Sequence, residues 1–107
     1  MTTIRFYRSQ GRLSGFTCRG HSGFAEAGAD IVCAAVTSAL RLAECTINDV
    51  YQANAAVSVD DQTAEITLTL PDPCKHAAGC GAVLEGFLLY MRELSKENPN
   101  HLSVLEV

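Results

Sequence analysis

Hydrophobic and polar residues alternate along four stretches of the chain. These stretches are residues 2–8, 12–19, 54–60 and 63–70, and the alternation predicts strands because successive side chains of a strand point to opposite faces. The short polar segments SQG and DDQ separate them into two hairpins. In the second strand, Leu13, Phe16 and Cys18 are the expected inward residues.

Two other segments carry apolar residues at intervals of three and four, which is typical of a helix with one buried face. The first runs from about residue 31 to residue 52 and follows Asp30, which is a good N-cap residue. The second spans residues 77–95, and a short strand is expected at residues 101–107. The apolar stripe of the first helix consists of Val32, Val36, Ala39, Ala43, Ile47 and Val50.

The element order is therefore ββαββαβ within 107 residues. This order predicts a single α+β domain, residues 1–107, with two helices packed on one face of a mixed or antiparallel sheet. The chain is 48% hydrophobic, which is enough to form a modest core.

Charge and cysteine content narrow the class of function. The net charge is −4 and no Lys/Arg cluster occurs, so we expect no direct nucleic-acid partner. An acidic domain instead favours the encounter with a basic partner. We also expect no signal peptide and no membrane partner, because the longest apolar run is interrupted by Glu85 and Gly86. Five cysteines, an odd number, indicate reduced thiols in the cytoplasm.

Candidate chemistry is concentrated in the segment from His21 to Cys33. With Asp30 as N-cap, Cys33 is the third residue of the helix, where free N–H groups and the helix dipole favour a thiolate. His21 lies 12 residues upstream on a glycine-flanked loop and is a candidate general base. Asp30 has two competing roles, to orient the imidazole or to cap the helix.

Structural interpretations of the same residues stay open at this point. A cysteine near a helix start is commonly a small core residue, and a loop histidine is commonly bonded to backbone. Cys74, His76 and Cys80 do not match a compact zinc motif, so we expect neither a metal nor a cofactor. A non-catalytic binding module remains the alternative to a cysteine enzyme.

The run GHSGFAEAGADIVCAAVT resembles the hallmark of the ribosomal-processing cysteine proteases of bacteria, the Prp type. The element order and the length fit that family as well. Cys74 and Cys80 depart from it, since few thiols are expected in that loop. The matching positions are Gly20, His21, Gly28, Asp30, Ile31, Val32, Cys33, Ala34 and Thr37.

The resemblance implies a cytoplasmic, homodimeric endopeptidase that removes a short N-terminal extension from a large-subunit ribosomal protein. It implies Cys33 as nucleophile, His21 as base and Asp30 as the acidic residue. It also implies an apolar pocket near Cys33 and closure of the loop 20–30 on substrate. The implied substrate-binding residues are Gly20, Ser22, Gly23, Gly28, Ala34 and Thr37. The alternative is a ribosome-associated binding module in which His21 and Cys33 are structural.

Overall fold

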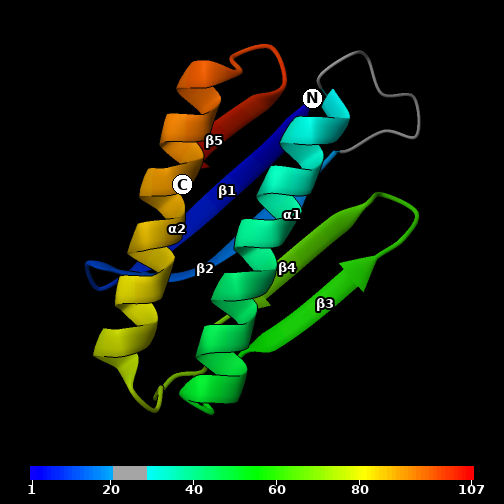
Figure 1. The fold of residues 1–107 in the computed structure, drawn as a ribbon. Helices are drawn as coiled ribbons and strands as arrows, with labels where there is room; N and C mark the ends of the chain where they lie inside the picture. Colours follow the sequence, from blue (N-terminus) through cyan, green and yellow to red (C-terminus); the bar gives the residue numbers. More distant parts are fainter. Residues whose placement is uncertain (21–28) are drawn as a thin grey trace.

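The computed structural model describes residues 1–20 and 29–107, drawn in Figure 1. The element order ββαββαβ is confirmed. The elements are β1 (Thr2–Ser9), β2 (Arg12–Arg19), α1 (Ala29–Cys45), the π-helical turn η1 (Thr46–Val50), β3 (Ala56–Asp60), β4 (Glu65–Thr69), α2 (Ala77–Glu97) and β5 (Leu102–Glu106).

The strands form one five-stranded sheet in the order β3-β4-β2-β1-β5. Neighbouring strands are antiparallel except β1 and β5, which are parallel, so the sheet is mixed. Both helices cover the same face of the sheet and run in opposite directions (Figure 1). The predicted α+β class is confirmed, and the starts of α1 and α2 lie at opposite ends of the helical layer.

The core lies between the sheet and the helices. Phe6 of β1, Phe16 of β2 and Phe87 of α2 form its aromatic centre, with ring centroids 5.0 to 6.1 Å apart. Such tilted and edge-on contacts are favourable beyond the area that they bury. The three inward residues predicted for the second strand, Leu13, Phe16 and Cys18, are all buried, as predicted.

Leu13 and Phe16 both face the core. In a regular strand, residues three positions apart point to opposite faces of the sheet. A register shift between Tyr7 and Arg8 explains this, because it leaves an extra residue, Ser14, in β2. Such a bulge resets the alternation of faces. Gly15 follows directly, and a side chain there would collide with the carbonyl oxygen of Leu68.

The first helix begins earlier than predicted. α1 starts at Ala29, so Asp30 lies within its first turn and is not the N-cap. Cys33 is consequently the fifth helical residue and not the third. Its N–H group is then satisfied within the helix, which weakens the argument that the helix start favours a thiolate at this position.

The end of the same helix also differs from a regular α-helix. The Tyr51 N–H donates to the carbonyl oxygen of Thr46 at 3.0 Å, five residues earlier, within the π-helical turn η1. The wider turn rotates the following residues relative to the apolar stripe. Val50, predicted to be in the stripe, is therefore 70% exposed, whereas Val32, Val36, Ala43 and Ile47 are buried as expected.

Residues 31–50 are long and apolar enough, by length and composition alone, to cross a membrane. Core helices of globular proteins pass the same test. Here one side of the segment packs into the core through Val36 and Ile47, while Arg41 is exposed on the other side. That arrangement is the one expected for a helix lying on a sheet.

Candidate active site

Cys33 lies on α1 at the border between the buried stripe and the exposed side of the helix. Its thiol is half-buried, the preceding Val32 is buried and the following Ala34 is exposed. The helical phase in the sequence predicted this border position, and the prediction is confirmed. A partly exposed thiol is accessible to a substrate in a way that a core cysteine is not.

Thr37 lies one helical turn beyond Cys33 and is exposed, as is Ala34. Residues four positions apart on a helix are neighbours on its surface, so Cys33 and Thr37 share one side of α1. These are two of the predicted substrate-binding residues, and both are accessible.

Gly20 marks the point where the chain leaves β2, at the end of the molecule where α1 begins (Figure 1). Its φ angle is +102°, and a side chain there would place its Cβ atom 2.7 Å from the carbonyl oxygen of Met1. Only glycine fits both conditions without strain. The structure thus gives Gly20 a backbone role at the end of β2.

Four other predicted site residues lie outside the described part of the chain: His21, Ser22, Gly23 and Gly28. The predicted closure of the loop 20–30 falls largely there too. For Asp30 the helical backbone is described and the side chain is not. The contact between His21 and Cys33, and the role of Asp30, therefore remain predictions from the sequence.

Three of the other thiols are poorly suited to act as nucleophiles. Burial raises the pKa of Cys18 to about 11, and the neighbouring Cys33 thiol contributes to that rise. Burial also raises the pKa of Cys80, whereas a hydrogen bond to Asp49 is the main cause of the raised pKa of Cys45. A raised pKa reduces the thiolate fraction at neutral pH, and the thiolate is the reactive form.

Since the charge of Cys33 is the second cause of this raised pKa, the thiols of Cys18 on β2 and Cys33 on α1 lie within electrostatic range of each other. Cys18 was predicted to be a core residue of its strand, and its burial confirms this. Sequence patterns assigned the two cysteines to separate elements and did not predict their proximity. Only the packing of α1 on the sheet brings them together.

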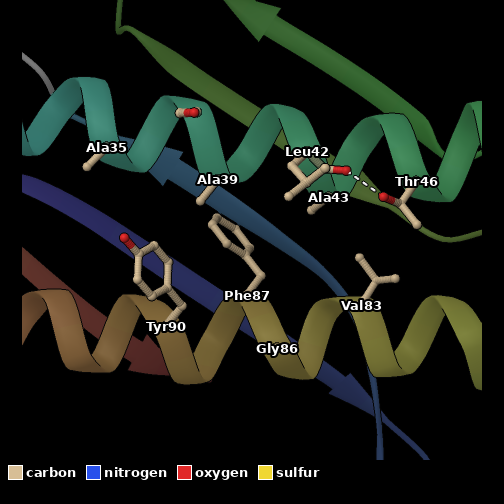
Figure 2. Close-up of a pocket in the computed structure, with 10 residues that line it drawn as sticks. Ala35, Ala39, Leu42, Ala43, Thr46, Val83, Gly86, Phe87 and Tyr90 are labelled. Carbon is tan, nitrogen blue, oxygen red and sulfur yellow. Dashed lines mark hydrogen bonds between the residues drawn. The ribbon is translucent and has the colours of Figure 1, made fainter.

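A groove of about 810 Å³ lies between α1 and α2 (Figure 2). Side chains from both helices line it. Figure 2 shows Leu42 of α1 and Phe87 and Tyr90 of α2 projecting into it. Cys33 does not line it, so it is not the apolar pocket that was expected beside the nucleophile. The groove was not predicted, although small residues at four-residue intervals, Ala35, Ala39 and Ala43, were its signal in the sequence.

The fold has close counterparts among solved structures. The crystal structure of the essential ribosomal processing protease Prp from S. aureus in complex with a substrate peptide superimposes with a TM-score of 0.89 at 18% identity, covering 100% of both chains. The same S. aureus protease with a covalently linked product peptide gives a TM-score of 0.84, again at 18% identity and with 100% of both chains covered. SMU.848 from Streptococcus mutans gives 0.88 at 23% identity, covering 100% of this chain and 94% of that one.

At these identities the structural similarity establishes the fold. No curated protein matches the sequence. The model of the family described as cysteine protease Prp matches residues 1–103, which is nearly the whole chain. Between a cysteine enzyme and a non-catalytic binding module, this match favours the enzyme. The chain belongs to the cysteine protease Prp family, and the protein is a cysteine protease.

Proposed function

We propose that this protease removes a short N-terminal extension from a large-subunit ribosomal protein, with Cys33 as the nucleophile and His21 as the general base. The observation that carries the proposal is the family match over residues 1–103, combined with the accessible border position of Cys33. The bound peptides of the S. aureus ribosomal processing protease support a peptide substrate. A basic ribosomal protein also suits a net charge of −4.

The proposed reaction is acyl transfer in two steps. His21 accepts the proton of the Cys33 thiol, and the sulfur attacks the carbonyl carbon of the scissile peptide bond. The imidazolium of His21 then protonates the leaving amine, and the C–N bond breaks to leave a thioester on Cys33. Water, deprotonated by His21, attacks the thioester, releases the carboxylic acid product and restores the thiol. A covalently linked product in the S. aureus protease agrees with this type of chemistry.

The proposed substrate site lies on the exposed side of α1 next to Cys33. Ala34 and Thr37 are exposed there, and Gly20 precedes in the sequence the other predicted binding residues, Ser22, Gly23 and Gly28. An apolar pocket beside Cys33 would accept the aromatic residue that precedes the cleaved bond in this family. Asp30, in the first turn of α1, is proposed to steady the imidazole of His21.

The test is cleavage of a full-length ribosomal protein that carries an N-terminal extension, followed by mass spectrometry of the intact product. We expect loss of the extension with the wild-type protease and no loss with Cys33→Ala. Cys45→Ser is the matched control, because Cys45 is on the same helix but exposed and about three turns away. Cleavage by Cys33→Ala, or no cleavage by the wild type, contradicts the proposal.

We further propose that the protein is a cytoplasmic homodimer that associates through the two helices. Support comes from the groove in Figure 2 and from the apolar side chains at its rim, where Leu42 is 69% and Tyr90 52% exposed. Contiguous exposed apolar surface of this kind is typical of an interface. Light scattering should give the mass of two chains for the wild type and of one chain for Leu42→Glu. Val59→Glu, on the distant strand β3 and 62% exposed, is the control that should stay dimeric.

A further inference from the structure

Cys74 and Cys80 converge on one oxygen atom. The Cys74 thiol donates to the carbonyl oxygen of Lys75 at 3.4 Å, and the Cys80 Sγ lies 3.9 Å from the same oxygen. Both thiols therefore lie beside the same backbone carbonyl group. The pKa of Cys80 agrees with this, because the charge of the Cys74 thiolate adds to the effect of burial in raising it.

The backbone around His76 produces this arrangement. His76 adopts a left-handed conformation, with φ 57° and ψ 43°, and it immediately precedes α2. The Cys80 N–H then donates to the His76 carbonyl oxygen at 2.9 Å, which places Cys80 in the first turn of the helix. The chain therefore folds back so that a cysteine before the helix and a cysteine inside it face the same carbonyl oxygen, that of Lys75.

The two thiols differ in accessibility. Cys80 is fully buried in the core, and Cys74 is half-buried on the segment leading to α2. Tyr51 covers the helix backbone beside Cys80, since a side chain at Gly79 would collide with its ring at 2.6 Å. A reagent in solution can therefore approach Cys74 more readily than Cys80.

We propose that Cys74 and Cys80 form a reversible intramolecular disulfide when the protein meets a low-molecular-weight disulfide such as oxidised glutathione. The site is separate from the proposed nucleophile, because α2 begins at the end of the helical layer opposite to the start of α1 (Figure 1). A disulfide is favoured over a metal site because no third His, Cys, Asp or Glu joins the pair among residues 1–20 and 29–107.

The reaction proceeds by two thiol–disulfide exchanges. The Cys74 thiolate attacks one sulfur of oxidised glutathione, which forms a mixed disulfide and releases one glutathione thiolate. The Cys80 thiolate then attacks the Cys74 sulfur and expels the second glutathione thiolate. The two protein thiols lose two protons and two electrons in total, and oxidised glutathione is reduced to two molecules of glutathione.

The sequence offers a direct way to map the bond. Lys75 lies between the two cysteines, so trypsin separates them into the peptides 42–75 and 76–92. Cys45 is in the first of these peptides, and the variant Cys45→Ser removes that ambiguity. Cys18 and Cys33 fall in the peptides 13–19 and 20–41, so a bond between them gives a different linked pair.

The experiment incubates folded Cys45→Ser protein with oxidised glutathione, blocks remaining thiols with N-ethylmaleimide in denaturant at mildly acidic pH, and digests without reduction. We expect peptides 42–75 and 76–92 to be linked, two of the four remaining thiols to be lost, and dithiothreitol to restore both. The same treatment of Cys45→Ser/Cys74→Ala should leave peptide 76–92 unlinked and its cysteine alkylated. That control replaces the more accessible cysteine and leaves the core residue Cys80 in place.

Three results would overturn the proposal. The first is that Cys74 and Cys80 both stay alkylatable at high oxidised glutathione. The second is that Cys74 retains glutathione as a stable mixed disulfide while Cys80 stays free. The third is that the linked pair forms only after the protein is unfolded, because the native arrangement then contributes nothing. None of these results bears on cleavage by Cys33, so this proposal and the proposed function fail separately.

Discussion

The two helices begin with different cysteine environments at opposite ends of the molecule. Near the start of α1, Cys33 is half-buried, and its neighbour Cys18 is a buried strand residue with a pKa raised to about 11. Near the start of α2, Cys74 and Cys80 share the carbonyl oxygen of Lys75. One end holds a thiol beside a strand that leads into the predicted histidine loop, and the other holds two adjacent thiols. The start of α1 therefore suits a nucleophilic thiol, and the start of α2 suits a disulfide.

The largest expected difference between the two ends is in the effect of alkylation on activity. Iodoacetamide should abolish cleavage of the ribosomal protein in step with modification of Cys33, because the alkylated sulfur can no longer attack a carbonyl. Modification of Cys74 should leave cleavage unchanged. Peptide mapping of partly inactivated samples, alongside the cleavage rate, measures this correlation.

His21→Ala provides the control for the dependence on a base. It should slow alkylation of Cys33 by on the order of tenfold or more, because the proposed base promotes formation of the reactive thiolate. The alkylation rate of Cys74 should stay unchanged. If Cys33 reacts equally fast in both proteins, the proposed pairing with His21 is wrong. If inactivation follows Cys74 instead, the nucleophile has been assigned to the wrong end of the molecule.

The next largest effect concerns the backbone at the end of β2. Gly20→Ala should destabilise the protein by about 2–3 kcal/mol, because alanine at a φ of +102° is strained and its Cβ would collide with the Met1 carbonyl. Urea denaturation measures the change. Gly11→Ala is the matched control, since Gly11 also has a positive φ, +81°, but has open space around it. An equal loss in both variants would show that the contact with Met1 contributes nothing.

Local patterns in the sequence were sufficient for the elements but not for their pairing. Alternation predicted β2, yet the bulge that places both Leu13 and Phe16 inward depends on β4, about fifty residues later. There the Leu70 N–H donates to the Ser14 carbonyl oxygen at 2.8 Å, and Gly15 packs against Leu68. The strand order and the parallel pairing of β1 with β5 are likewise contacts between distant segments.

The same limit applies to the candidate site. Helical phase correctly predicted that Cys33 lies at the border of the stripe, because phase is a local property. It did not predict the electrostatic effect of Cys33 on Cys18, since that effect requires α1 to be docked on the sheet. The left-handed conformation of His76, which brings Cys74 and Cys80 together, has no signal in a pattern of apolar residues.

Alkaline pH should reduce stability through Cys18. Its pKa rises from the ordinary 9.0 to about 11 on folding, so the unfolded chain loses this proton first as the pH increases. The stabilisation is complete below pH 9 and is lost as the pH rises through 11, by roughly 2–3 kcal/mol in total. Urea denaturation of wild type and Cys18→Ala over this range should show a shallower pH dependence in the variant. Parallel curves would mean that the folded environment does not perturb Cys18.

The smallest effect distinguishes two glycines at the start of α2. Gly81→Ala should stabilise the protein by about 0.5–1 kcal/mol. A Cβ atom at residue 81 would meet no other atom, and alanine is preferred to glycine inside a helix. Gly79→Ala should instead cost about 1 kcal/mol, because its Cβ would meet the Tyr51 ring, which has to shift. Thermal denaturation of the two variants compares them directly. If both are stabilising, Tyr51 does not pack firmly over the first turn of α2, and the cover beside Cys80 is looser than its contacts indicate.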